Sequence, residues 1–169
     1  MELLRDHRIL VTGVLTDDSL AYGIAEAALR EGADVLLTGA GRGLSLTRRM
    51  AKRLGIEHDV LPLDVTDEAQ IEDAVRTVTS TWGRLDGLVH AIGFAPESAL
   101  GQGMLKTSFA DVATALEIST YSLAALVKEF RPLLAKSTAV GGASVIALDF
   151  DGSRAYPMYD WMGVMKAGL

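Results

Sequence analysis

A tyrosine and a lysine seven residues apart, Tyr159 and Lys166, are the residues of this chain best suited to chemistry. Pro157 favours a helix start here, because the first turn of a helix leaves the N–H that proline lacks unpaired. On a helix, residues seven apart lie within about 20° of each other and about 10 Å apart along the axis. A phenol and an ammonium on one face can stabilise an oxyanion and hold a polyhydroxyl cofactor. The same spacing fits an ordinary amphipathic helix with a surface lysine. Motifs elsewhere in the chain are therefore needed to distinguish a chemical site from such a helix.

Short apolar runs alternate with helical patterns along the chain. We expect strands at 9–12, 35–38, 60–63, 85–92 and 144–148, and helices at 19–30, 44–54, 67–82, 108–136 and 156–166. Thr66 is the expected N-cap of the third helix, and the long fourth helix is expected to break at or before Pro132. This alternation predicts the α/β class, with a Rossmann-type doubly wound parallel sheet and a crevice at the carboxyl ends of its strands. The chain 1–169 is expected to be a single domain.

Composition narrows the range of partners. The 169 residues carry a net charge of −6 and no cysteine, so thiol chemistry is excluded and no basic cluster favours nucleic acid. The first eight residues include charged side chains and lack the apolar run of a signal peptide. No stretch approaches the roughly 20 apolar residues of a membrane span. We therefore expect a cytoplasmic protein with neither nucleic acid nor membrane as partner.

The loop after the first expected strand has features of a dinucleotide site. Gly13 permits a tight turn, and the long turn that follows ends at Ser19 and Leu20, where a helix begins. The N–H groups of a helix N-terminus bind phosphate, and Ser19 adds a hydroxyl donor. The spacing is not G-x-G-x-x-G, and an ordinary strand–helix loop is the alternative.

The next strand ends carry weaker signals. Arg42 stands where an NAD site often places an acid, which leaves NADPH open beside NADH. Asp64, followed by Val65, can accept a hydrogen bond from an adenine amine or cap the next helix. Gly93, preceded by Ile92, would let the backbone approach a ribose or simply end a strand.

Other polar groups favour structural roles. His90 lies within an expected strand, where a histidine is more often a core residue than a catalyst. Asp149, Asp151 and Asp160 form a cluster in sequence without a histidine partner, so no metal site is expected.

Together these motifs resemble the enoyl-acyl-carrier-protein reductases, a divergent branch of the short-chain dehydrogenase/reductases. The resemblance covers the chain from Ile9 onward through these segments: Gly13 with Ser19, 19–25, 64–65, 90–96 and Tyr159-x6-Lys166. Segment 149–155 resembles the NADH-dependent branch that isoniazid targets. Ketoacyl reductases carry Tyr-x3-Lys and a strand-end serine. Here Met162 stands four residues before the lysine, and Asp149 follows the last strand, which favours enoyl over ketone reduction.

The resemblance implies a role for each site residue. Tyr159 would donate a hydrogen bond to the enolate oxygen of an enoyl thioester on acyl carrier protein or coenzyme A, in fatty acid biosynthesis. Lys166 would bind the nicotinamide ribose, and Phe150 would line the acyl pocket. NADH binding falls to Gly13, Ser19, Leu20, Asp64, Val65, Ile92, Gly93 and Lys166. A ketone-reducing enzyme and a non-catalytic NAD-binding module remain as alternatives.

The resemblance also concerns length and assembly. Chains of the family continue well past position 169, so we expect a partial enzyme whose turnover in isolation is not assured. In such a segment the sheet would lack its C-terminal strands, the fifth strand would be an exposed edge, and the helix bearing Lys166 would be weakly anchored. A homotetramer formed through the helices at 108–136 and 156–166 is also implied.

Overall fold

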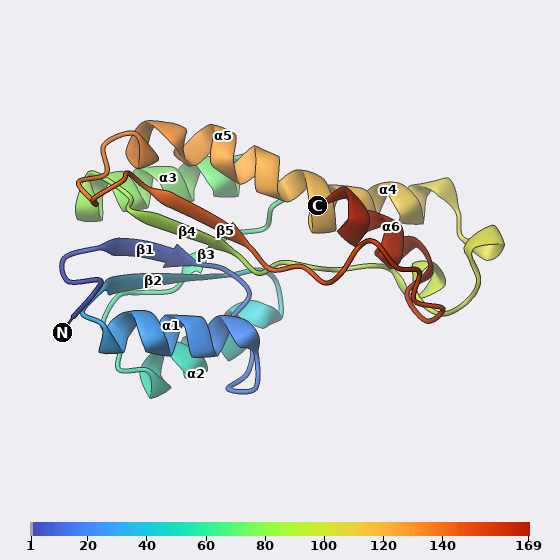
Figure 1. Ribbon diagram of the computed structural model, residues 1–169, viewed down its shortest axis with the longest axis horizontal. Helices are drawn as coiled ribbons and strands as arrows, with labels where there is room; N and C mark the ends of the chain where they lie inside the picture. The colour runs from blue at the N-terminus through green and yellow to red at the C-terminus, as the bar shows by residue number, and fades with distance from the viewer. Residues whose placement is uncertain (1) are drawn as a thin grey trace.

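The computed structural model describes residues 2–169, which form a five-stranded parallel sheet between two layers of helices (Figure 1). The strand order is β3-β2-β1-β4-β5, and every neighbouring pair is parallel. The strands are β1 (Arg8–Val11), β2 (Asp34–Gly39), β3 (Leu61–Pro62), β4 (Gly87–His90) and β5 (Ser144–Ala147). The predicted α/β class is confirmed, although β3 and β4 are shorter than expected.

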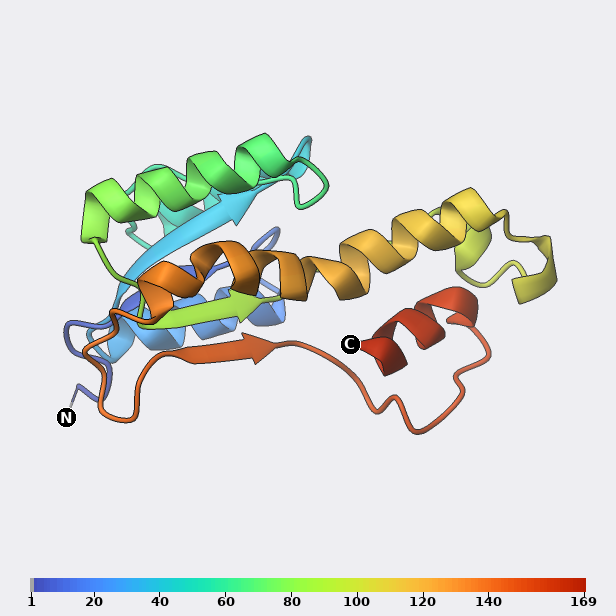
Figure 2. The ribbon, with the colours of Figure 1, turned by 90° about the horizontal axis from the view of Figure 1, so that it is seen from above.

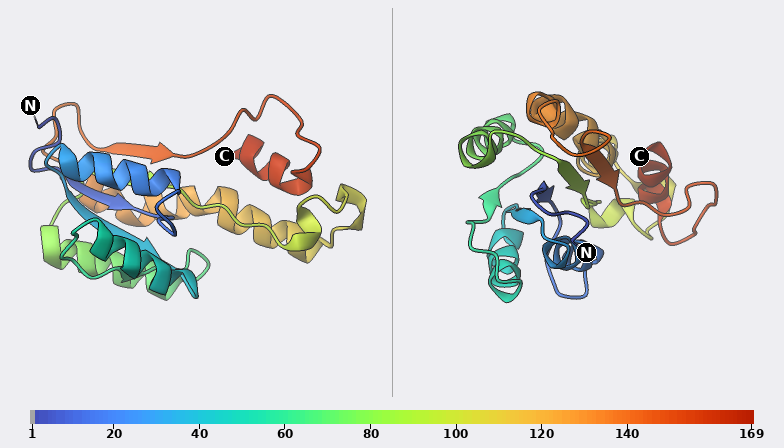
Figure 3. Two further views of the ribbon diagram at one scale, coloured as in Figure 1. Left: turned by 90° about the horizontal axis from the view of Figure 1, so that it is seen from below. Right: turned by 60° about the vertical axis from the view of Figure 1, so that its left-hand side comes forward.

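Helices cover both faces of the sheet. They are α1 (Leu20–Arg30), α2 (Gly43–Arg53), α3 (Glu68–Trp82), α4 (Phe109–Leu116), α5 (Ser122–Leu134) and α6 (Asp160–Gly168). The 3₁₀ turns η1 (Glu97–Ala99) and η2 (Met104–Lys106) lie in the loop after β4, and the π-helical segment η3 (Glu117–Tyr121) joins α4 to α5. Figure 1 shows α1 and α2 on one face, with α3 and α5 on the other. Figures 2 and 3 show α4 and α6 side by side beyond the strand ends.

Alternation along the strands divides the core into two layers. Leu10 and Val11 are both fully buried but point to opposite faces, as adjacent residues in a strand must. Val11 packs in the layer with α1 and α2, whose small Ala25 lets the helix approach closely. Leu10 packs in the layer with α3 and α5. This layer also contains Phe130, the largest fully buried side chain among residues 2–169.

Side-chain oxygens cap the starts of α1 and α3. Ser19 caps α1, accepting a hydrogen bond from the Tyr22 N–H at 3.2 Å. The cap of α3 is Asp67, which accepts from the Ala69 and Gln70 N–H groups at 3.0 and 3.3 Å, so the prediction of Thr66 was wrong. A carboxylate accepts these N–H groups more strongly than a hydroxyl does.

The fourth predicted helix is interrupted well before Pro132. Pro132 lies within α5, two residues before its end, and does not break it. A proline there removes only one hydrogen bond near the terminus. The irregularity is instead the π-helical segment at 117–121, which separates α4 from α5.

The run from α4 through α5, Phe109–Leu134, corrects the expectation that no stretch is long and apolar enough to span a membrane. Among residues 2–169, this one helical run passes that test by length and composition, which alone is weak evidence for a membrane span. Its Leu126, Phe130 and Leu133 are buried against the sheet, as in the core helix of a globular domain.

The edge position of β5 was predicted correctly. β5 pairs only with β4 within the described sheet, and Val145 and Ile146 are 42% and 49% exposed. Both faces of this strand are therefore less covered than those of β1 and β4.

Replacing Phe130 by alanine should lower the free energy of unfolding by about 3–5 kcal/mol, because it opens a cavity between α5 and the sheet. Urea unfolding followed by circular dichroism measures this change. Phe109, which is 84% exposed, is the matched control, and its change to alanine should cost under about 0.5 kcal/mol. Equal losses in the two variants would contradict this account of the core.

Candidate functional site

A cavity of about 460 Å³ lies at the carboxyl ends of β1, β2, β3 and β4. Its walls are the loops that follow these strands, which parallel pairing brings to one edge of the sheet. Five of the eight predicted cofactor residues line it: Gly13, Asp64, Val65, Ile92 and Gly93. The structure therefore assembles the predicted crevice from segments up to 80 positions apart in the sequence (Gly13 to Gly93).

Gly13 is required by both its conformation and its surroundings. Its φ is +78°, and a Cβ atom there would lie 2.0 Å from the carbonyl oxygen of Ala91, in the loop after β4. Thr12, which sequence reasoning missed, joins the same two strand ends. Its hydroxyl donates to the Val89 carbonyl at 3.0 Å and accepts from the Ala91 N–H at 2.9 Å. No motif in the sequence distinguishes this threonine from an ordinary strand residue.

Ser19 and Leu20 lie at the start of α1 and are not part of the cavity lining. The Ser19 hydroxyl donates to the Thr16 carbonyl at 2.7 Å while it caps the helix. Leu20 is 75% exposed. Their contact with a cofactor stays a prediction.

Asp64 lines the cavity but does not cap α3. One of its carboxylate oxygens accepts hydrogen bonds from the Thr66 N–H and hydroxyl, at 3.0 and 2.7 Å. These bonds hold the turn between β3 and α3, so Asp64 has a fixed position at the crevice wall. Arg42 is exposed at the N-cap position of α2 and has no capping side-chain bond there.

Lys166 lies on α6 beside the crevice. Its Nζ donates to the carbonyl oxygen of Leu148, just after β5, at 2.9 Å. A Cβ built on Gly93 would lie 3.7 Å from Lys166 Cε and 3.8 Å from Nζ, so the ammonium stands next to the cavity wall. Burial lowers the pKa of Lys166, and the Asp149 carboxylate opposes that shift.

Tyr159 precedes the helix instead of lying within it. The predicted start of this helix at position 156 was wrong, because α6 begins at Asp160, whose φ of +41° turns the chain. The Asp160 carboxylate accepts from the Gly103 N–H at 2.8 Å and holds that conformation in place. The seven-residue spacing to Lys166 therefore spans a helix start, and the two residues lie at opposite ends of α6.

The ring of Tyr159 belongs to an aromatic cluster with Phe150 and Tyr156. Phe150 stacks on Tyr159 with ring centroids 4.9 Å apart and 24° between the planes, while Tyr156 meets both rings edge-on. The structure thus brings the two predicted substrate residues, Phe150 and Tyr159, into contact. Sequence reasoning missed Tyr156, whose only signal was an aromatic side chain close to Pro157.

The expected weak anchoring of α6 is not what the structure shows. Asp160 and Trp161 bond to the loop after β4, through Gly103 and Met104, and the Trp161 indole N–H donates at 3.0 Å. The other end of the helix is held by Lys166 and by a hydrogen bond to its Met165 carbonyl. Both ends of α6 are therefore fixed.

His90, at the end of β4, is a buried histidine with one bonded nitrogen. Its Nε2 lies 2.8 Å from the Ser122 hydroxyl, which donates to the Ile118 carbonyl at 2.6 Å, so Nε2 carries the proton and donates. Nδ1 is a buried atom without a hydrogen-bond partner within residues 2–169. Burial, then the charge of Lys166, lowers the pKa of His90 to about 4. The core interpretation fits this neutral ring.

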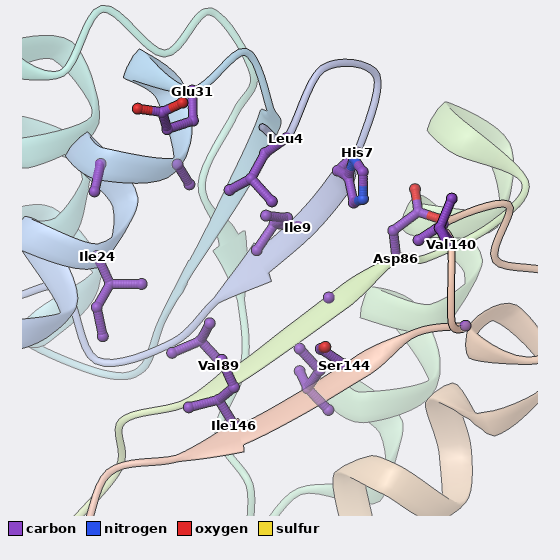
Figure 4. A pocket seen from close by; sticks show the side chains of 16 residues that line it. Leu4, His7, Ile9, Ile24, Glu31, Asp86, Val89, Val140, Ser144 and Ile146 are labelled. Atoms are coloured by element: carbon purple, nitrogen blue, oxygen red, sulfur yellow. The ribbon is translucent and has the colours of Figure 1, made fainter. Parts of the chain in front are cut away.

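A second cavity, of about 400 Å³, lies on the α1 face over β1, β4 and β5 (Figure 4). Apolar side chains dominate its wall, among them Ile9, Ile24, Val89 and Ile146. Asp86 at its rim already accepts bonds from the Arg8 N–H and from the residues after α5. None of the predicted catalytic or cofactor residues lines this cavity, so the crevice at the strand ends is the candidate site.

Comparison with known proteins agrees with this geometry. The sequence model of the family described as enoyl-(acyl carrier protein) reductase matches residues 13–169. The chain belongs to this family. Similar members are the NADH enoyl-[acyl-carrier-protein] reductases of Mycolicibacterium smegmatis (39% identical, 99% of this chain), Neisseria meningitidis (38%, 100%) and Salmonella typhimurium (38%, 100%). The chain spans 61–64% of the length of these enoyl reductases.

The buried His90 should make the protein less stable at acidic pH. Above the ordinary histidine pKa of about 6.5 both states are neutral, whereas between that value and about 4 only the unfolded state gains the proton. The free energy of unfolding should therefore fall across this window by about 3 kcal/mol, since one pKa unit corresponds to about 1.36 kcal/mol.

Replacing His90 by leucine should remove this part of the pH dependence, as measured by urea unfolding at pH 7, 5.5 and 4. The His7→Gln variant serves as the control, because it loses a histidine but keeps the buried ring. A His90→Leu curve parallel to that of the wild type would show that His90 is not the group responsible.

Proposed function

We propose that this chain carries the cofactor crevice and catalytic pair of an NADH-dependent enoyl-acyl-carrier-protein reductase. The observation that supports this most strongly is Lys166 standing beside Gly93 at the wall of the strand-end cavity, within a chain of that family. The relatives named above act with NADH, as their names state.

The residues at the crevice fit a nicotinamide dinucleotide. Gly13 and Gly93 present bare backbone at the wall, which permits close approach of a ribose or phosphate. The N–H groups at the start of α1 provide partial positive charge for a phosphate. Asp64 offers an acceptor at the far wall. NADPH is the alternative cofactor, because Arg42 is exposed after β2 and could pair with its additional phosphate.

NADH, when bound, would supply a hydride to the alkene carbon remote from the thioester carbonyl. Tyr159 then donates a hydrogen bond from its hydroxyl to the enolate oxygen that forms. One such donor stabilises the transition state by about 3–4 kcal/mol in comparable oxyanion sites. Lys166 binds the ribose hydroxyls and contributes positive charge. Phe150, which stacks on Tyr159, orients the phenol and provides an apolar wall for the acyl chain. A proton from solvent completes the saturated product.

Two finer points belong to the same proposal. The outer surface of α4, η3 and α5 exposes Leu116 (48%) and Tyr121 (61%) beside the end of α6. Exposed apolar side chains of this kind support assembly into a homo-oligomer through this face, and the family resemblance implies a tetramer. A reaction on enoyl thioesters of fatty acid biosynthesis also suggests a cytoplasmic location.

The deciding experiment follows NADH absorbance with an enoyl thioester and, separately, with a ketoacyl thioester. Oxidation with the enoyl substrate alone is the expected result. Oxidation with the ketoacyl substrate would favour a ketone reductase instead. NADH binding without oxidation of either kind would favour a non-catalytic module, and parallel runs with NADPH determine the cofactor.

Changing Tyr159 to phenylalanine should lower turnover of the enoyl thioester at least about 100-fold, because it removes the donor to the enolate oxygen. NADH affinity, measured by fluorescence titration, should change less than twofold. Tyr121→Phe is the matched control, since Tyr121 is 61% exposed on the outer face and should leave turnover unchanged. Undiminished turnover in Tyr159→Phe would rule out the role of its hydroxyl.

Changing Gly93 to alanine should weaken NADH binding while leaving the fold intact. The added Cβ makes only ordinary contacts, at 3.7 Å and beyond, in the free protein, but it occupies space at the crevice wall. Gly23→Ala is the control, because its Cβ would meet no atom within 4 Å. We expect a tenfold or larger rise in Kd, about 1.4 kcal/mol, only for Gly93→Ala. An unchanged Kd would place NADH elsewhere.

A further inference from the structure

The π-helical segment between α4 and α5, together with the residue that follows it, carries hydroxyl groups that bind three different parts of the site. Ser119 donates to the Phe94 carbonyl at 2.7 Å and accepts the Phe94 N–H at 2.8 Å. Ser122, which follows the segment, bonds to His90 of β4. Thr120 donates to the Met165 carbonyl of α6 at 2.7 Å. Each bond connects the irregular segment to a different neighbour of the crevice.

The extra residue of the π turn explains this arrangement. The Ser122 N–H bonds to the Glu117 carbonyl, five residues back, instead of the usual four. The Ser122 hydroxyl donates to the Ile118 carbonyl, four residues back, at 2.6 Å. The inserted residue rotates the following positions around the axis, so neighbouring side chains reach partners on separate elements.

Thr120 makes its contact at the turn of α6 that bears Lys166. The Met165 carbonyl accepts both the Thr120 hydroxyl and, at 3.0 Å, the Leu169 N–H. A Cβ on Gly168 would lie 3.4 Å from the Thr120 methyl, so the methyl packs against the last turn of α6. Met165 is also the buried residue of this helix. Thr120 therefore fixes the part of the helix from which Lys166 projects.

We propose that Thr120 is a positioning residue for Lys166, acting through the Met165 carbonyl. The inference rests on the proposed function, in which Lys166 binds the nicotinamide ribose. A nine-residue helix is marginal by itself, so its orientation depends on such contacts. With Met165 held, the adjacent Lys166 reaches Leu148 and Gly93 from a fixed direction. Without the hydroxyl, the ammonium samples a wider range of positions and becomes more exposed.

Three variants of the chain separate the hydroxyl from its surroundings. Thr120→Val removes the hydroxyl and keeps the shape, whereas Thr120→Ser keeps the hydroxyl and loses the methyl. Thr114→Val is the matched control, because the Thr114 hydroxyl bonds to Ala110 within α4 and touches no other element through that bond. The first readout is the rate at which acetic anhydride acetylates Lys166, measured by peptide mass spectrometry relative to exposed Lys136. The second is the Kd for NADH.

Thr120→Val should raise the relative acetylation rate of Lys166 and the Kd for NADH about fivefold each, as expected for one lost hydrogen bond. Thr120→Ser and Thr114→Val should stay within about twofold of the wild type. Equal Lys166 to Lys136 ratios in Thr120→Val and Thr114→Val would overturn the proposal. If the wild type itself fails to bind NADH while the acetylation contrast persists, the positioning role stands and the proposed function fails.

Discussion

The parallel pairing of β1 with β4 is the constraint on which the candidate site depends. It places Val11 opposite Val89, so the loops after both strands leave the sheet together. The Thr12 hydroxyl bonds to Val89 at the end of β4 and to Ala91 in the loop that follows. Gly13 passes so close to Ala91 that no side chain fits between them. Because this junction is rigid, the backbone around Gly13 and Gly93 forms a fixed wall for a ligand.

The other half of the site depends on irregular backbone. The left-handed conformation of Asp160 starts α6 one residue after Tyr159, and Thr120 in the π turn at 117–121 provides a hydroxyl that holds the far end of α6. Such conformations cost free energy and persist only where the surroundings determine them. Here the Gly103 N–H and the Met165 carbonyl supply those determining contacts. The position of α6, which joins the aromatic cluster to Lys166, is therefore held by bonds to residues outside the helix.

The sequence was sufficient for the sheet and for the crevice wall, because both follow from periodicity. Buried parallel strands are short apolar runs, and a glycine directly after one, such as Gly13, marks a tight turn. The start of α6 and the π turn were not predictable in the same way. Both depend on single hydrogen bonds from side chains to distant backbone, such as that from Thr120 to Met165, which leave no repeat in the sequence. Thr66 and Asp67 show the same difficulty at short range, since either can cap a helix.

The charges around Lys166 follow from the same packing. His90 is buried in the strand next to β5, and Lys166 lies close enough to lower its pKa, so the imidazole stays neutral beside the ammonium. The Asp149 carboxylate favours the charged form of Lys166 and so opposes the effect of burial, which lowers the pKa of this lysine. The lysine thus remains the positive group at this end of the crevice. In the proposed reaction, a developing enolate and a ribose hydroxyl would both benefit from such a charge, because low-dielectric surroundings strengthen its field.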